Sequence, residues 1–129
     1  IGLCLTGNFA LTLMGDESVL AAVASQPSLP FLRPKALHMS PEEIEATKRN
    51  IDRTAPMMAY RFQKDWISPC RRFKHIRETF NEPDNERIRM AELPGRKHAV
   101  FTAHFCNKAG HPTREALDAV LDYFSNQLK

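Results

Sequence analysis

The sequence predicts an α/β fold, a parallel sheet with flanking helices. Short apolar runs alternate along the chain with stretches whose apolar residues have a helical period, which is the pattern of successive strand–helix–strand units. The run at 20–24, Leu-Ala-Ala-Val-Ala, is apolar without alternation, as expected of a strand covered on both faces. In chain order we expect strands over 1–4, 20–24, 57–62 and 87–93, and helices over about 9–14, 41–52, 70–80 and 113–128.

The first part of the chain combines two strands with one helix. The first strand ends at a tight turn between Gly2 and Gly7, and Gly15 is well placed to end the helix that follows. A proline stops the second strand, and the irregular residues 28–39 are expected to cross the carboxyl edge of the sheet. The part from Leu29 to Met39 is a candidate lid.

Local signals are strongest for the helix over 41–52. Ser40 is a good N-cap, Pro41 suits the first helical position, and Glu43 completes a capping box. The run from Met57 to Phe62 then forms the third strand.

The second half of the chain repeats the alternation. After a loop over 64–69, Ser68-Pro69 is expected to cap a helix that ends near Phe80. The strand over 87–93 alternates between apolar and polar residues, which suits a position near the edge of the sheet. The apolar stripe of the last helix is predicted to contain Leu117, Val120, Leu121 and Phe124.

Composition indicates a single globular domain. Of 129 residues, 43% are hydrophobic and 26% are charged, which is ordinary for a globular protein rather than a disordered one. The net charge is +3 and the basic residues are scattered, so we expect no nucleic-acid partner. No apolar run reaches the length of a bilayer span, so we expect no membrane partner. Three widely spaced cysteines do not suggest a disulfide framework, which favours a cytoplasmic location.

Three residues that suit nucleophilic catalysis follow three of the predicted strands. Cys4 lies in a glycine-flanked turn of the nucleophile-elbow type, Asp65 follows the third strand, and His98 follows the fourth. Because the carboxyl ends of parallel strands meet at one edge of a sheet, we expect these side chains to come together. Asp52 and Asp84 are rival candidates for the acid, but neither comes shortly after a buried strand.

Three segments carry a resemblance to a known family: Gly2 to Gly7 (GLCLTG), Arg61 to Pro69 (RFQKDWISP) and Glu92 to Val100 (ELPGRKHAV). With them, the chain resembles the carboxyl-terminal half of the dienelactone hydrolase family of α/β-hydrolases. The resemblance implies that residues 1–129 form a partial α/β-hydrolase domain that starts at the nucleophile strand and lacks its upstream half. It also implies a cysteine-dependent hydrolase that acts on a small-molecule carboxylic ester or lactone and uses no metal or organic cofactor.

Each candidate has a role in the expected mechanism. His98 helps to form the Cys4 thiolate, which attacks the ester carbonyl to give a thiol acyl-enzyme, and Asp65 fixes the imidazole tautomer. The backbone amide of Leu5 is one expected oxyanion donor, and the second lies in a loop upstream of this chain. Since loss of such a donor costs about 2.7–4 kcal/mol of transition-state stabilisation, we expect the fragment alone to be a poor enzyme. Its first strand should leave an apolar sheet edge exposed.

Two positions depart from the family pattern. Thr6 replaces the first of two paired glycines in the elbow. Thr102, four residues beyond the histidine, stands where dienelactone-cleaving members have an arginine that holds the substrate carboxylate. A neutral or differently anchored ester is therefore at least as good an expectation as dienelactone. Trp66 and Thr102 are candidates for the substrate pocket, although an aromatic residue at position 66 suits the core equally well.

Two other interpretations stay open. His98, His104, Cys106 and His111 have zinc-ligand chemistry, but they lack the short paired spacings of compact sites, so we expect no metal. A hydrolase fold can also persist as an interaction domain whose chemistry has lapsed. Cys70 and Cys106 are expected to be packing residues rather than redox partners.

Overall fold

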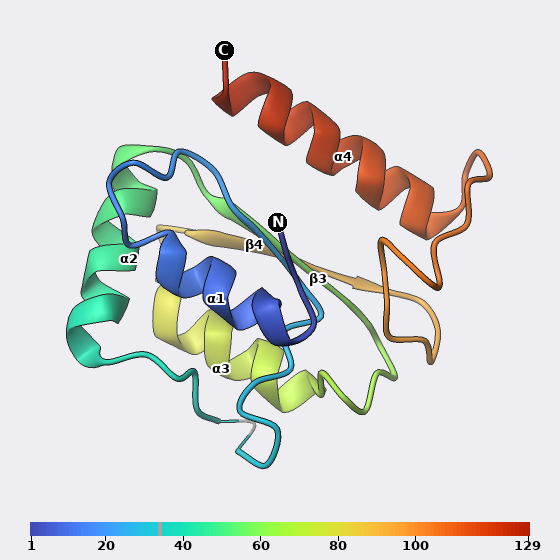
Figure 1. Ribbon diagram of the computed structural model, residues 1–129, viewed down its shortest axis with the longest axis horizontal. Helices are drawn as coiled ribbons and strands as arrows, with labels where there is room; N and C mark the ends of the chain where they lie inside the picture. The colour runs from blue at the N-terminus through green and yellow to red at the C-terminus, as the bar shows by residue number, and fades with distance from the viewer. Residues whose placement is uncertain (34) are drawn as a thin grey trace.

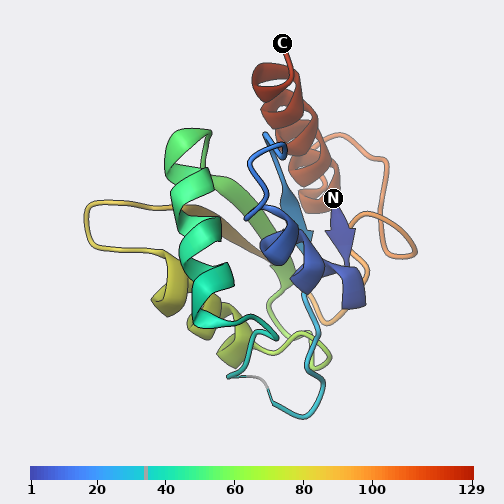
Figure 2. The same cartoon turned by 60° about the vertical axis from the view of Figure 1, so that its left-hand side comes forward.

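Four parallel strands lie side by side in their sequence order, between helices on both faces (Figure 1, Figure 2). The computed structural model describes residues 1–33 and 35–129. The elements are β1 (Gly2–Leu3), α1 (Leu5–Leu13), β2 (Val23–Ser25), α2 (Pro41–Arg53), β3 (Met57–Phe62), α3 (Cys70–Phe80), β4 (Ile88–Leu93) and α4 (Pro112–Gln127). The predicted α/β class with a parallel sheet and flanking helices is confirmed.

Two apolar cores lie on the two faces of the sheet. The larger one packs the sheet against α1, α2 and α3, and its most deeply buried large residues are Leu11, Met14, Met57, Phe73, Ile76, Phe80 and Ile88. The smaller one packs the other face against α4, and it contains Val23, Tyr60, Phe62, Leu93, Val100, Ala116, Val120 and Tyr123. All of β2 is buried, as its unbroken apolar sequence predicts.

Element boundaries differ from the prediction in the first part of the chain. Helix α1 begins at Leu5 rather than near Phe9, because the turn at Cys4 delivers the chain directly into the helix. Strand β2 begins at Val23, where its pairing with β3 starts. The segment 28–39 forms neither helix nor strand in its described part, as predicted, and Pro34 lies outside the described residues.

One predicted cap is confirmed and the other is wrong. In the capping box of α2, Ser40 Oγ accepts from the Glu43 amide at 3.1 Å and Glu43 Oε2 accepts from the Ser40 amide at 2.7 Å. Ser68 does not cap α3, which begins at Cys70 without a side-chain cap. The Ser68 hydroxyl donates to the Pro27 carbonyl at 2.7 Å instead, so it joins two loops.

The predicted stripe of the last helix is partly wrong. Val120 is buried as expected, but Leu121 is 57% exposed. The buried residues of α4 are Thr113, Ala116, Val120 and Tyr123. Small Ala116 allows the helix to approach the sheet, while Tyr123 fills the space beside it, so the packed stripe is centred on Val120 rather than on the leucines.

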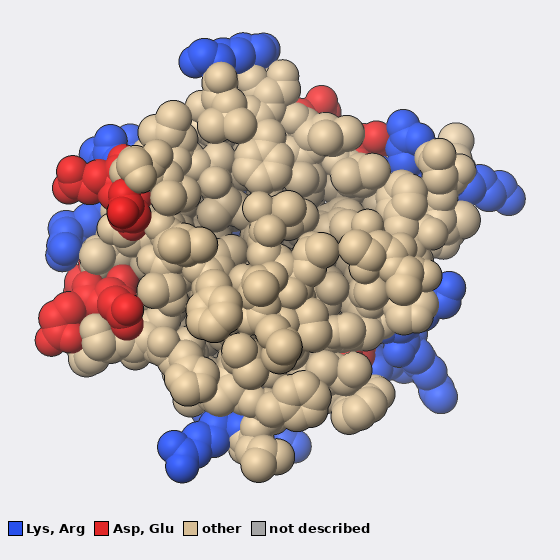
Figure 3. All heavy atoms as spheres, viewed as in Figure 1, with Lys and Arg blue, Asp and Glu red and all other residues tan. Residues whose placement is uncertain are grey.

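One side of the molecule, over α1, is apolar. The side chains of Ile1, Leu5, Phe9, Leu13 and Leu20 are 45% to 61% exposed. Figure 3 shows lysine, arginine and acidic side chains around the rim of this view and an uncharged centre. Strand β1 is at the edge of the sheet, which agrees with the expected apolar edge. Among residues 1–33 and 35–129, no helix has the length and apolar character needed to cross a membrane.

Candidate active site

Cys4 occupies a strained turn at the carboxyl end of β1. Its φ of 55° and ψ of −113° place a non-glycine residue in a positive-φ region that side chains disfavour. The Cys4 amide donates to the Ser25 carbonyl at 3.0 Å, and its carbonyl accepts from the Gly7 and Ser28 amides at 3.0 and 3.2 Å. These bonds hold the partly exposed thiol at the apex of the turn.

Both glycines of the turn lie so close to neighbouring backbone atoms that a side chain at either position would overlap them. A Cβ atom on Gly2 would overlap the Thr6 carbonyl, and one on Gly7 would lie 2.9 Å from the Pro27 Cα atom. At position 6 the chain has ordinary helical backbone, so threonine is accommodated. The Thr6 hydroxyl also accepts from the Leu3 amide at 2.8 Å. The departure from the family pattern at Thr6 therefore leaves the elbow geometry intact.

Asp65 enters the site on a short loop after β3. Its side chain is 1% exposed. The Oδ1 atom accepts hydrogen bonds from the Ile67 amide at 2.9 Å and the Ser68 amide at 3.1 Å. These two bonds fix the plane of the carboxylate and leave Oδ2 to face another partner.

A buried arginine shapes the loop that carries Asp65. The Arg61 side chain is 1% exposed and pairs with Glu92 at 2.7 Å. Its Nε atom donates to the Ser68 carbonyl at 2.8 Å, and its Nη2 atom donates to the Gln63 carbonyl at 3.0 Å. The guanidinium therefore ties both ends of the loop to the strand from which it leaves.

The imidazole of His98 lies between the thiol and the carboxylate. Its Nδ1 atom is 2.6 Å from Asp65 Oδ2 and its Nε2 atom is 3.1 Å from Cys4 Sγ. An ionised carboxylate can only accept, so Nδ1 carries the proton and Nε2 presents its lone pair to the thiol. The structure thus brings together the three residues that the sequence predicts as nucleophile, base and orienting acid.

Two further side chains fix the loop that carries His98. The Nδ1 atom of His104 accepts from the Ala99 amide at 3.0 Å and from the His98 amide at 3.3 Å. The side chain of Gln26, buried at the end of β2, accepts from the Val100 amide at 3.4 Å. The backbone on both sides of the imidazole is therefore held by the neighbouring protein.

Ser28 is a fourth polar residue at the thiol. It is fully buried in the segment after β2, and its Oγ atom is 3.2 Å from Cys4 Sγ. The buried guanidinium of Arg72 holds the adjoining chain, because it donates to the carbonyls of Leu29, Pro30 and Ala36. Burial also lowers the pKa of Arg72.

The remaining site candidates lie at the surface. Leu5 is the first residue of α1, so its amide is among those that have no acceptor within the helix. Trp66 is 77% exposed, which makes the alternative of a core residue wrong. Thr102 is exposed in the turn after His98. The pocket roles of Trp66 and Thr102 stay predictions.

The rival acids take part in other interactions. Both Asp52 oxygens accept from Arg87, at 2.8 and 2.9 Å, and the hydrogen bond from Arg87 holds the pKa of Asp52 below its usual value. Asp84 is exposed in the turn between α3 and β4. The side chain that contacts His98 Nδ1 is therefore that of Asp65, as predicted.

The candidate zinc ligands are separated by their own contacts. His98 and His104 have the partners given above, and His111 Nδ1 lies 2.8 Å from the Thr113 hydroxyl at the start of α4. No cluster of three potential metal ligands occurs in the described part of the chain. Cys70 is exposed, so its expected packing role is wrong, whereas Cys106 is partly buried.

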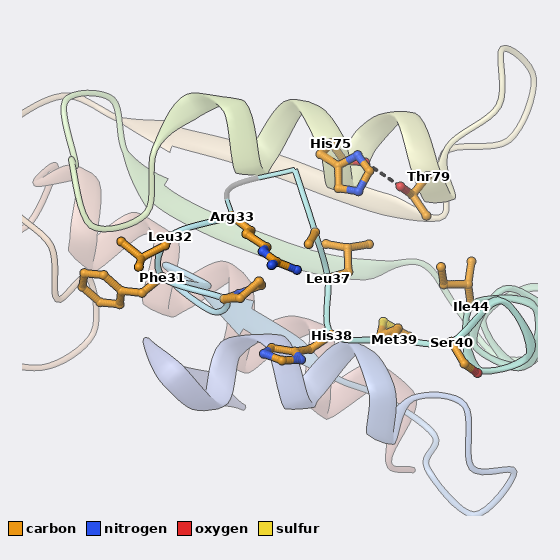
Figure 4. Close-up of a pocket in the computed structure, with 12 residues that line it drawn as sticks. Phe31, Leu32, Arg33, Leu37, His38, Met39, Ser40, Ile44, His75 and Thr79 are labelled. Atoms are coloured by element: carbon orange, nitrogen blue, oxygen red, sulfur yellow. Dashed lines mark hydrogen bonds between the residues drawn. The ribbon is translucent and has the colours of Figure 1, made fainter.

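A separate hollow of about 800 Å³ lies under the irregular segment before α2 (Figure 4). Residues of that segment, among them Phe31 and Met39, line one part of it, and His75 and Thr79 of α3 line another. Cys4, Asp65 and His98 are not among its lining residues. The lid role of the segment from Leu29 to Met39 stays a prediction.

Sequence reasoning missed the residues that position the predicted three. Ser28 and Arg72 act through contacts between segments that are far apart in the chain, whereas Arg61 and His104 mainly bind backbone groups of the loops beside them. A weak signal existed for Arg61, because a charged residue inside an otherwise apolar strand must find buried partners.

Comparison with known proteins adds no relative. No protein-family model matches the chain, and no curated protein matches it either.

Proposed function

We propose that this protein is a hydrolase that cleaves a carboxylic ester or lactone through a thiol acyl-enzyme. The observation that supports the proposal is the continuous path from Cys4 Sγ to His98 Nε2 at 3.1 Å and from His98 Nδ1 to Asp65 Oδ2 at 2.6 Å. The strained turn at Cys4 and the parallel sheet beneath it suit the carboxyl-terminal part of an α/β-hydrolase domain of the dienelactone hydrolase type.

The chemistry follows from these contacts. His98 Nε2 takes the thiol proton, and the Cys4 sulfur attacks the carbonyl carbon of the ester. When the tetrahedral intermediate collapses, the bond to the alkoxide breaks and the alkoxide receives the proton from His98. Water then attacks the thioester while His98 removes a proton from it, and the thiol is restored with release of the acid. Asp65 stabilises the imidazolium in both steps, so no cofactor is needed.

The first amide of α1 supports the attack. The Leu5 amide lies next to the nucleophile at the positive end of the helix, where it can donate to the oxyanion that forms at the carbonyl oxygen. Thr102 is uncharged and exposed, which favours a substrate without a carboxylate that needs an arginine there. The three free cysteines suit the reducing environment of the cytoplasm.

The test is intact-protein mass spectrometry of the chain after brief exposure to p-nitrophenyl acetate. This ester has a good leaving group, so the readout depends chiefly on the reactivity of Cys4 and on His98. We expect one acetyl group, mapped by peptide analysis to Cys4, and its loss in both Cys4→Ser and His98→Ala.

Cys70 provides a control inside the same molecule. It is an exposed thiol outside the site, so it reports the rate at which a cysteine without the contact to His98 is acetylated. If Cys4 reacts no faster than Cys70 in a folded protein, and no ester is hydrolysed, the hydrolase proposal fails and a lapsed hydrolase fold takes its place.

A further inference from the structure

We infer that the Ser28 hydroxyl is a hydrogen-bond donor to the Cys4 sulfur and stabilises its thiolate form, which makes Ser28 a fourth catalytic residue. The inference rests on the proposed role of Cys4 as nucleophile. It starts from the 3.2 Å distance between Ser28 Oγ and Cys4 Sγ and from the full burial of Ser28.

The direction of this hydrogen bond follows from the other side of the sulfur. His98 Nε2 presents its lone pair at 3.1 Å and receives the thiol proton, because the imidazole keeps its own proton on Nδ1, which donates a hydrogen bond to Asp65. The sulfur then offers only lone pairs to Ser28, so the serine hydroxyl must donate. After proton transfer the sulfur is an anion, and a hydrogen bond to a charged acceptor is stronger than one to a neutral acceptor.

The position of Ser28 is fixed by the backbone around it. The Pro27 carbonyl accepts from Ser68 at 2.7 Å, the Ser28 amide donates to the Cys4 carbonyl at 3.2 Å, and the Leu29 amide donates to Asn8 Oδ1 at 3.0 Å. Arg72 binds the Leu29 carbonyl. The hydroxyl is thus held beside the sulfur before the thiolate forms, and it needs little reorganisation when the charge appears.

The experiment measures the rate of iodoacetamide alkylation of Cys4 as a function of pH, with peptide mapping to separate Cys4 from Cys70 and Cys106. Ser28→Ala removes the donor and leaves Cys4, His98 and Asp65 in place. We expect the midpoint of the pH–rate profile to move upward by about one pH unit, equivalent to a tenfold loss of thiolate at a fixed lower pH.

A second pair of variants covers the case in which Ser28→Ala does not fold. Ser28→Thr and Ser28→Val match each other in shape, but only threonine keeps a hydroxyl. The inference requires the midpoint of the pH–rate profile to be higher in Ser28→Val than in Ser28→Thr. Thr47→Val is the control for a merely structural effect, because it removes a hydroxyl that donates to the buried Leu11 carbonyl at 3.0 Å, away from the sulfur, and we expect it to leave the midpoint in place.

An unchanged midpoint in Ser28→Ala would overturn the inference, and so would an equal shift in Thr47→Val. A downward shift would overturn it as well, because it would mean that the thiol donates to Ser28. The proposed function is tested separately. Loss of acetylation at Cys4 with the Ser28 shift intact would refute the hydrolase alone, whereas acetylation without the shift would refute only the role of Ser28.

Discussion

The Ser68 hydroxyl donates to the Pro27 carbonyl across 2.7 Å, although the two residues are 41 positions apart in the chain. This bond joins the loop that carries Asp65 to the segment that holds Ser28 against Cys4. Asp65 and Cys4 are therefore positioned by one connected set of buried hydrogen bonds, to which Arg61 and Arg72 also contribute.

Ser68→Ala should lower the free energy of unfolding by about 1–3 kcal/mol, because the Pro27 carbonyl loses its donor in a buried place. Urea denaturation measures the change. Ser125→Ala is the matched control, since Ser125 is exposed near the end of α4, and it should change stability by less than about 0.5 kcal/mol. Equal effects of the two substitutions would show that the bond contributes nothing to stability.

Substitution of Arg61 should destabilise the protein more than substitution of its ion-pair partner Glu92. Arg61→Lys cannot serve the Ser68 and Gln63 carbonyls together with Glu92, so it should lower the free energy of unfolding by about 2 kcal/mol.

Glu92→Gln should cost less than about 1 kcal/mol, because the Glu92 side chain is 37% exposed and solvent screens its charge. Denaturation of both variants side by side gives the comparison. A larger loss from Glu92→Gln would mean that the ion pair, rather than the loop carbonyls, is the main task of Arg61.

Asp52 makes stability depend on pH. Arg87 holds the pKa of Asp52 below its usual value, so the ion pair stabilises the fold above about pH 4 and this contribution is lost as the pH falls through the lowered pKa. Asp52→Asn should therefore destabilise the protein at pH 7, by about 1 kcal/mol or less because the Asp52 side chain is 41% exposed.

Denaturation curves of wild type and Asp52→Asn should converge near pH 2. A difference that stays constant from pH 7 to pH 2 would contradict the assignment of this pH dependence to the carboxylate of Asp52.

Gly7→Ala should disturb the elbow. The added Cβ would lie 2.9 Å from the Pro27 Cα atom and 3.0 Å from the Ser25 carbonyl oxygen, both of them backbone, so the turn must shift at a cost of about 1–3 kcal/mol. Gly110→Asn is a suitable contrast, since Gly110 has open space around it and asparagine tolerates its φ of 76°. Thermal unfolding that ranks Gly110→Asn as the more damaging change would contradict this account.

The three central site residues were predictable because each follows a strand of a parallel sheet. Cys4, Asp65 and His98 all come shortly after apolar runs, and the geometry of such a sheet carries the ends of those runs to one edge. The helix over 41–52 was also predictable, because the residues of its capping box lie within four consecutive positions of the sequence.

The partners of these residues were not predictable in the same way. Ser28 reaches Cys4 because β1 and β2 are neighbours, and the strand order follows from packing rather than from any local pattern. The exposure of Leu121 was not predictable either, because the apolar stripe of α4 is wider than the face that packs, and the buried residues of that face are Ala116, Val120 and Tyr123 together with Thr113. Residues that follow a strand of the sheet or cap a helix could be predicted from the sequence, whereas the side chains that support them from neighbouring loops could not.

The central claim is that Cys4, His98 and Asp65 act as one unit, and a double-mutant cycle tests it most directly. The measurement is the rate constant for acetylation of Cys4 by p-nitrophenyl acetate in wild type, His98→Ala, Asp65→Asn and the double variant, with Asp52→Asn as control. The account predicts that each single variant slows acetylation about a hundredfold or more, that the double variant is little slower than His98→Ala, and that Asp52→Asn is unaffected. The account would be contradicted if the loss of rate in the double variant equalled the product of the two single losses. It would also be contradicted if Cys4 in Asp65→Asn were acetylated at the wild-type rate.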